Sequence, residues 1–324
     1  MIKLESLNKY VEVYLNDVDN YIYSVISPNF VYDIVKGVSF GGKRIRPIIM
    51  ILLSNILGGN SRDQMILAAS GVELMHLASL MHDDVIDSGS KRHNVTSAHL
   101  LFSNQKAILG GDFLFSESFK AMVLTSNIEV LKSISNVSST LVSGELQQLK
   151  EKETSIVSES IYYDIIYKKT ASLFVASAEI SSLIQRQSII SEVAQFGKNI
   201  GMAFQIIDDL IDYKSINTAK EQGVDFFEQK QTLPIIFSLS ENSLLSEREK
   251  VNLKYLFSRY VKNAQDFVEA SNLIEKAVGF AYTKKIADNF CIEAKANLDS
   301  FCYNESVEKQ LMFEIIDFFN SRTF

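Results

Sequence analysis

Apolar residues recur at three- and four-residue steps between Pro47 and Pro234, and this period predicts helices. The interval contains no proline, so long helices can run through it without a kink. No segment alternates convincingly between apolar and polar residues, as a half-buried strand does. We expect helix connections at four polar breaks, which are residues 58–60, 88–94, 151–155 and 214–223. The pattern therefore predicts an all-α fold.

Two of the predicted helices, residues 66–87 and 193–213, are apolar on nearly every face until their last turns. A helix that is apolar all round belongs in the middle of a protein. Each of the two helices ends in a carboxylate cluster of the form Asp-Asp-x-x-Asp. The clusters are Asp83, Asp84 and Asp87 in the first helix, and Asp208, Asp209 and Asp212 in the second.

The spacing within each cluster favours a divalent cation. On a helix the first and last Asp stack on one face, and the middle Asp lies about 100° around. Like charges at that spacing repel each other, and the dipole at a helix C-terminus also disfavours anions. Hard ions such as Mg²⁺ take carboxylate oxygens and commonly share the ion with substrate phosphates. The two clusters therefore predict a Mg²⁺ site for a phosphorylated substrate.

Basic residues occur where a diphosphate would need them. The segment GGKRIRP at 41–47 places three cations beside two glycines, and glycines let the backbone approach a ligand. Lys and Arg complement phosphate oxygens, Arg as a bidentate fork and Lys as a point charge. Further cations are Lys91 and Arg92 after the first cluster, Lys220 and Lys230 after the second, and Lys168 and Lys169 between them.

Composition narrows the class of protein. The 324 residues, 47% hydrophobic and 22% charged, are enough for a sizeable core. No linker-like or low-complexity stretch divides the chain, so we expect one domain over residues 1–324. The net charge of -7 argues against nucleic acid as a partner, because binding a phosphate backbone needs a positive surface.

The sequence also predicts a location. The N-terminal residues include acids and lack an apolar core followed by a cleavage site, so they do not form a signal peptide. The longest apolar run, residues 48–57, is too short for a bilayer, which takes roughly 20 residues. Cys291 and Cys302 lack metal-ligand spacing and are expected to be buried free thiols. We expect a soluble, cytoplasmic protein with no transmembrane segment.

These residues resemble the trans-isoprenyl diphosphate synthases, and within them the long-chain polyprenyl (octaprenyl-like) synthases. The matching segments follow the family's order and cover the chain from Gly41 to Pro234. They are GGKRIRP (41–47), ELMHLASLMHDDVID (73–87), GGDFLF (110–115), GELQQL (144–149), KKTASLF (168–174), FQIIDDLIDY (204–213) and QKQTLP (229–234).

The resemblance implies an isoprenoid synthase fold, in which one large bundle of helices surrounds a deep central cavity, and a homodimer. The two clusters would face each other across the cavity mouth and hold about two to three Mg²⁺ ions. The metal ligands would be Asp83, Asp84, Asp87, Asp208, Asp209 and Asp212. Among these, Asp83, Asp84, Asp87 and Asp208 are predicted to be catalytic, together with Lys169 and Gln205.

The resemblance also implies two substrate sites. The residues that bind the allylic diphosphate would be Arg92, Lys169, Thr170, Lys220 and Lys230, with Gln205 near the reacting carbons. Isopentenyl diphosphate, the second substrate, would be held by Lys43, Arg46, His76 and His93.

Three positions depart from the family's pattern. An ungapped alignment places Arg92-His93 where the family has two arginines, so His93 would bring a weaker, pH-dependent charge to the isopentenyl site. A one-residue slip would place Lys91-Arg92 there instead. Residues 229–232 read Gln-Lys-Gln-Thr in place of Gly-Lys-Pro-Thr, and residues 219–220 read Ala-Lys in place of Gly-Lys.

The implied enzyme is a prenyltransferase that ionises an allylic diphosphate, such as farnesyl or geranylgeranyl diphosphate. The double bond of isopentenyl diphosphate then attacks, and a proton is lost. In the family, a bulky aromatic residue four or five positions before the first cluster closes the cavity early. Here these positions are Ser79 and Ala78, both small. We therefore expect a long all-trans product of octaprenyl class, suited to a quinone side chain.

Three alternatives remain from the sequence. A shorter-chain farnesyl or geranylgeranyl diphosphate synthase shares the same motifs. A non-catalytic subunit of a heteromeric prenyl synthase is a second alternative, although such subunits commonly lose one cluster and both are present here. The dipeptide His82-Asp83 would also fit a metal phosphohydrolase.

Overall fold

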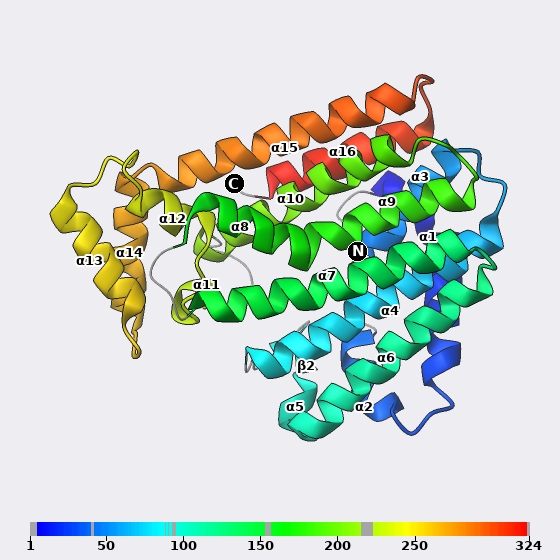
Figure 1. Cartoon of the computed structure of the whole chain (residues 1–324), viewed down its shortest axis with the longest axis horizontal. Coiled ribbons are helices and arrows are strands. Elements are labelled where there is room, and N and C mark those ends of the chain that lie inside the picture. The colour runs from blue at the N-terminus through cyan, green and yellow to red at the C-terminus, as the bar shows by residue number, and fades with distance from the viewer. Residues whose placement is uncertain are drawn as a thin grey trace. The chain divides into compact units, whose positions relative to one another are not determined.

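Helices make up nearly all of the structure that we describe, a computed structural model (Figure 1). It describes residues 5–39, 42–87, 89, 91–92, 95–152, 157–214 and 223–322. The chain divides into two compact units. The first unit comprises residues 1–141, 173–197 and 297–314, and the second comprises residues 142–172, 198–296 and 315–324. The predicted single domain over residues 1–324 stays a prediction.

The first unit contains α1 (Glu5–Ile26), α2 (Tyr32–Ser39), α3 (Ile45–Ile56), α4 (Arg62–Ile86), α5 (Ala98–Leu101) and α6 (Asn104–Leu124). The second unit contains α8 (Glu159–Ile166), the π-helix η1 (Tyr167–Ala171), α11 (Val224–Phe227), α12 (Leu233–Leu239), α13 (Glu247–Ser258) and α14 (Ala264–Lys276). Helices with residues in both units are α7 (Ile128–Lys152), α9 (Ser172–Ile184), α10 (Ile190–Lys214), α15 (Gly279–Phe301) and α16 (Val307–Ser321).

Strand structure in the described residues is confined to β1 (Lys91–Arg92) and β2 (Val95–Thr96), which pair antiparallel with Lys91 opposite Thr96. The all-α prediction is therefore confirmed. The predicted connection at residues 58–60 is confirmed, because α3 ends at Ile56 and α4 begins at Arg62. The breaks predicted at 88–94, 151–155 and 214–223 lie partly outside the described residues. In the part that is described, β1 occupies Lys91–Arg92, and the helices α7 and α10 continue to Lys152 and Lys214.

Helix α4 is the central element of the first unit. It packs against α1, α2, α3, α5 and α6, and Figure 1 shows it beside α6. At Gly71 the two helices approach closely, because a Cβ there would lie 2.7 Å from Met122 Cε and 3.1 Å from the carbonyl oxygen of Ser118. The Ser118 hydroxyl donates a hydrogen bond of 2.7 Å to the Gly71 carbonyl. A larger residue at Gly71 would push α4 and α6 apart.

The burial predicted for α4 and α10 is confirmed. Among the described residues, α4 is the one helix long and apolar enough to cross a membrane, and 72% of its most apolar window is buried inside the protein. A core helix has that character. Helix α10 is buried along most of its length, and its fully or nearly fully buried side chains include Ile200, Ile206, Ile207 and Leu210.

A buried ion pair holds the GGKRIRP segment against α4. Arg44, the residue before α3, has a left-handed backbone (φ 53°) and is 5% exposed. Its guanidinium donates to Glu73 and to Asp19, each at 2.9 Å, and to the carbonyl of Ser39. A buried charge needs such partners. Of the three cations in this segment, Arg44 therefore has a structural role.

In the second unit, α12 packs against α8, α13 and α14. Pro234 lies in the first turn of α12, where its missing N–H costs no helical hydrogen bond. The end of α10 joins the same core through Leu210 and Tyr213, which cluster with Phe226, Ile235 and other buried side chains. The second acidic cluster is thus anchored by apolar residues between and beside its carboxylates.

Candidate functional site

The first acidic cluster lies at the C-terminal end of α4. The Asp87 N–H donates to the Asp83 carbonyl at 2.8 Å, so these two residues are one helical turn apart, as predicted. Asp84 is 5% exposed, and the Gly89 N–H donates to its carbonyl at 3.0 Å. The chain therefore turns back over Asp84 directly after the helix.

The three carboxylates of the second cluster have different surroundings. The Asp208 side chain is 36% exposed and its Oδ1 lies 3.7 Å from Arg322. Asp209 is 1% exposed. Both Asp212 oxygens accept backbone hydrogen bonds, from the N–H of Val224 at 3.2 Å and from that of Asp225 at 3.0 Å. Asp212 thereby binds the first turn of α11, where free N–H groups favour a carboxylate.

Asp209 is enclosed by polar side chains from two helices and from the segment between α11 and α12. Its Oδ2 accepts a hydrogen bond of 2.8 Å from the Tyr162 hydroxyl on α8. Its Oδ1 accepts one of 2.7 Å from Gln205 Nε2, one turn earlier on α10. Lys230 Nζ lies 4.0 Å from Asp209 and 3.0 Å from Asp225.

Burial raises the pKa of Asp209 and of Asp212 to about 7 each. Lys230 opposes this shift but does not cancel it. Burial also disfavours the charge on Lys230, yet Asp225 and Asp209 hold the pKa of this ammonium well above its ordinary value. Burial therefore makes the carboxylates of Asp209 and Asp212 costly to ionise. A divalent cation beside them would stabilise their charged form, so the residues fit the predicted Mg²⁺.

Within the described residues, no three Asp, Glu, His or Cys side chains already converge as ligands of one ion. Mg²⁺ usually binds through one or two carboxylates together with water and substrate phosphates.

The lysine pair of the second unit lies on the π-helix η1. The Lys169 ammonium donates to Gln148 Oε1 at 2.7 Å and pairs with Glu145. Lys168 donates to Gln147 at 2.7 Å. A Cβ at Gly144 would lie 2.7 Å from Lys168 Cβ, so this glycine lets α7 approach the π-helix. A π-turn of this kind is common at functional sites.

Three predicted isopentenyl-site residues belong to the first unit. Arg46 is 7% exposed, and its guanidinium stacks on the Phe174 ring at 4.6 Å. Burial lowers the pKa of Arg46 to about 10, and its Nε has no hydrogen-bond partner in the described structure. Lys43 is exposed and His76 is half-buried. A buried guanidinium with an unsatisfied N–H suits an anionic ligand.

Several predicted residues lie outside what the structure describes. His93 and Lys220 are not among the described residues, and for Lys91 and Arg92 only the backbone, in β1, is described. Their predicted contacts with substrate stay predictions.

The sequence did not single out five polar residues that contact the predicted site. Tyr162, Glu145, Gln148, Asp225 and Arg322 contact Asp209, Lys169, Lys230 or Asp208. Glu145 and Gln148 lie in the GELQQL segment with one-turn spacing, which could have indicated a shared helix face. Nothing in the sequence pattern pointed to Tyr162 or Arg322.

The dipeptide His82-Asp83 contributes to helix packing. His82 Nε2 donates to the carbonyl of Ile108 at 3.1 Å and lies 3.3 Å from Asp112, both on α6. Its ring fills the space that a side chain at Gly111 would need. This contact with α6 explains the histidine without a phosphohydrolase metal site.

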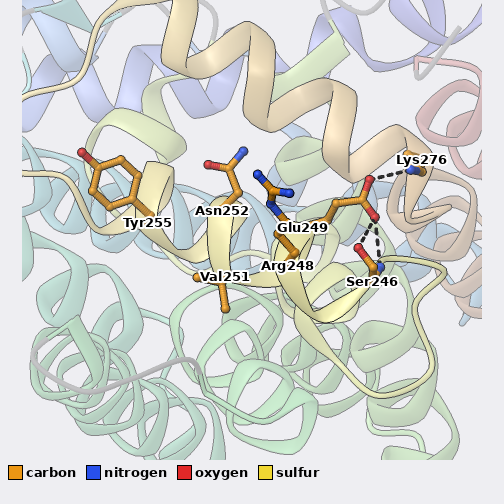
Figure 2. A pocket seen from close by; sticks show the side chains of 7 residues that line it. All are labelled: Ser246, Arg248, Glu249, Val251, Asn252, Tyr255 and Lys276. Atoms are coloured by element: carbon orange, nitrogen blue, oxygen red, sulfur yellow. Dashed lines mark hydrogen bonds and ion pairs between the residues drawn. The ribbon is translucent and has the colours of Figure 1, made fainter.

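A surface hollow on α13 is separate from these residues. Figure 2 shows its lining, in which Glu249 bonds to Ser246 and pairs with Lys276. Ser246 and Glu249 form the capping box of α13, so these contacts stabilise the helix start. None of the predicted site residues lines this hollow.

The all-α fold and the two helices that end in Asp-Asp-x-x-Asp clusters are those of a prenyltransferase of the isoprenyl diphosphate synthase class. A family model described as "Polyprenyl synthetase" matches residues 29–274, and the chain belongs to this family.

Comparisons with individual proteins agree with this family assignment. A prenyl transferase from Synechocystis is 31% identical over 287 residues, which cover 86% of this chain and 85% of that protein. The structure of a decaprenyl diphosphate synthase from Rhodobacter capsulatus has a TM-score of 0.89 and 29% identity, with 98% of each chain covered. A polyprenyl synthase from Caulobacter crescentus, complexed with calcium and isoprenyl diphosphate, has a TM-score of 0.90 and 28% identity, covering 99% of this chain and 98% of that one. The predicted isoprenoid synthase fold is confirmed.

Proposed function

We propose that the chain is a Mg²⁺-dependent synthase that adds isopentenyl diphosphate head to tail to an allylic diphosphate. The observation that carries the proposal is the second acidic cluster. Asp209 is buried and Asp212 half-buried beside it, and desolvation raises the pKa of each to about 7. A cation that arrives with a diphosphate would stabilise their charged form.

The proposed metal ligands are the six clustered aspartates, for about two to three ions. The Asp208 side chain is 36% exposed, whereas Asp209 is 1% exposed, so Asp208 is the better placed of these two to bind an ion directly. Asp209 and Asp212 already accept hydrogen bonds from the protein and would act through water. When bound, Mg²⁺ would neutralise charge that develops on the departing diphosphate. The Caulobacter protein is complexed with calcium as well as with isoprenyl diphosphate, which supports a divalent ion in the proposed reaction.

The chain's own residues would bind and orient the substrates. Lys169 and Lys230 would donate to diphosphate oxygens, exchanging contacts with Glu145 and Asp225 for contacts with the ligand. Gln205 would lie beside the reacting carbons, with both ends of its amide held by Thr170 and Asp209. An apolar lining would exclude water, which would otherwise capture the allylic cation.

We expect the isopentenyl site to be separable from the allylic site by mutation. Lys43→Ala, Arg46→Ala and His76→Ala should each raise the KM for isopentenyl diphosphate by at least about tenfold. The KM for the allylic starter should change much less, because these residues are assigned to the other diphosphate. Steady-state kinetics with each substrate varied in turn measures both constants. Equal increases in the KM for isopentenyl diphosphate and in the KM for the allylic starter would contradict the assignment of these three residues to the isopentenyl site.

The product is proposed to be an all-trans polyprenyl diphosphate of octaprenyl class, made for a quinone side chain. Small residues at Ala78 and Ser79 support a long product, and the structural relative from Rhodobacter is named for a decaprenyl product. We also propose a cytoplasmic homodimer. Apolar side chains exposed in the first unit, including Leu100, Leu109 and Val123, would be covered by a second copy of the chain.

Incubation with isopentenyl diphosphate, an allylic starter and Mg²⁺, followed by product sizing, tests the function. We expect products that elongate in isoprene steps up to the octaprenyl class. Products that stop at farnesyl or geranylgeranyl length would identify a shorter-chain synthase. No elongation by the pure chain, with activity restored by a partner subunit, would identify a component of a heteromeric enzyme. Release of phosphate without longer chains would contradict the proposal.

A further inference from the structure

A chain of hydrogen bonds in the second unit links a tyrosine on α8 to Gln205. The Tyr162 hydroxyl donates to Asp209 Oδ2 at 2.8 Å. Gln205 Nε2 donates to Asp209 Oδ1 at 2.7 Å. At the other end, the Thr170 hydroxyl donates to Gln205 Oε1 at 2.7 Å. Both ends of the Gln205 amide are therefore held, and one of them is held through Asp209.

The orientation of Asp209 depends on these donors. A carboxylate that is 1% exposed has little access to water and needs hydrogen bonds or opposite charge to stay ionised. Lys230 Nζ is 4.0 Å from Asp209 Oδ1, beyond hydrogen-bond distance, and lies nearer to Asp225. The hydroxyl of Tyr162 and the amide of Gln205 therefore fix how the carboxylate is rotated. Tyr162, itself 3% exposed, is held in place by the surrounding core.

The π-helix explains how two residues eight positions apart reach the same pair of side chains on α10. In an uninterrupted α-helix, Thr170 would lie about 80° around the axis from Tyr162. Residues Tyr167–Ala171 form a π-helix, whose turn is wider. The wider turn reduces that rotation, so Tyr162 and Thr170 can both face α10.

We propose that Tyr162 is a positioning residue for chain elongation, because its hydroxyl fixes Asp209 and Asp209 fixes the Gln205 amide. The role of Gln205 beside the reacting carbons rests on the proposed function, whereas the hydrogen-bond chain itself does not. Without the hydroxyl, Asp209 Oδ2 loses its donor and the carboxylate is free to rotate. The Gln205 amide then loses a fixed partner, and fewer bound substrates are aligned for reaction.

Tyr162→Phe tests the proposal, because it removes the hydroxyl and keeps the ring. We expect kcat for isopentenyl addition to fall roughly 10–100-fold, the range for residues that orient a reacting group. The KM of each substrate should stay within about twofold, since no diphosphate contact is removed. The matched control is Tyr163→Phe, whose hydroxyl donates to Glu159 at 3.3 Å instead; it should keep parental kcat. Equal losses in the two variants, or a change confined to KM, would overturn the proposal.

A second measurement needs neither substrate nor metal. The side-chain amide of Gln205 can be observed by nitrogen-15 NMR and assigned by its loss in Gln205→Leu. This resonance should shift in Tyr162→Phe and stay in place in Tyr163→Phe. An unchanged resonance in Tyr162→Phe would overturn the hydrogen-bond chain whatever the activity. A parent protein that makes no longer chains would instead overturn the proposed function, so the two failures are distinguishable.

A double variant shows whether Tyr162 acts through Gln205. In the Gln205→Leu background, adding Tyr162→Phe should cause no further loss of kcat, because the group that the tyrosine orients is already absent. Additive losses would show that Tyr162 acts by another route and would overturn the positioning role.

Discussion

Replacing Asp83 or Asp208 with alanine is expected to lower kcat/KM at least about 100-fold, which corresponds to roughly 3 kcal/mol of transition-state stabilisation. Each change removes a charged oxygen ligand at the end of a buried helix. The neighbouring carboxylates cannot replace it, because Asp209 and Asp212 are held by hydrogen bonds within the protein. Removal of divalent ions with EDTA should abolish turnover, and added Mg²⁺ should restore it.

A matched control for these variants is Asp33→Ala. Asp33 is an exposed helical aspartate, paired with Lys36 at 2.7 Å, and exposed pairs of this kind contribute little. This variant should keep parental activity. Full turnover by a metal-free preparation would contradict the metal-dependent mechanism, as would parental activity in both Asp83→Ala and Asp208→Ala.

Ser79→Phe is expected to shorten the product from the octaprenyl class to farnesyl or geranylgeranyl length. Ser79 lies four residues before Asp83 on α4, on the same face and about 6 Å deeper. Its side chain is half-buried, whereas Ala78 is 0% exposed. A phenyl ring at Ser79 would block a tail that descends along this face, while the first condensation stays active. Product sizing after exhaustive incubation measures the effect.

Ala78→Phe should shorten the product as well, but the structure adds a second effect. Ala78 is seven residues after Gly71, so the two lie within about 20° of each other on the helix, and Gly71 faces α6. A phenyl ring at Ala78 would therefore also strain the α4–α6 contact.

Ser79→Ala is the control for the Ser79→Phe variant, because it removes the hydrogen bond to the His76 carbonyl without adding a larger side chain. It should leave product length unchanged. Unchanged length in a folded Ser79→Phe enzyme would disprove the proposed path of the tail.

Apolar periodicity was sufficient to predict the helices and the two buried helices that carry the acidic clusters. In α4 and α10 the helical period and the position of each cluster in the last turns match the structure, although both helices begin three to four residues earlier than predicted. These features depend on the local sequence alone, through the 3.6-residue repeat and the distribution of apolar side chains.

The differences within the second cluster could not be predicted in that way. Asp208 and Asp209 are neighbours in sequence, yet one is partly exposed and the other is enclosed by Tyr162, 47 residues away. Long-range contacts of this kind leave no periodic signal. The segment GGKRIRP shows the same limit, because its middle cation, Arg44, pairs with Glu73 in the core. Arg44 therefore has a structural role, although the sequence placed it in a segment predicted to bind phosphate.

The π-helix at Tyr167–Ala171 bears on how this part of the gene can vary in length. A π-turn holds one more residue than the α-turn it replaces, so losing one residue there would let an ordinary α-helix form. Tyr162 and Thr170 would then be seven α-helical steps apart, which returns to within about 20° of the starting direction. The two side chains would therefore still face the same way. Homologous chains should accordingly tolerate a single-codon deletion in this turn better than one in the middle of α8 or α9.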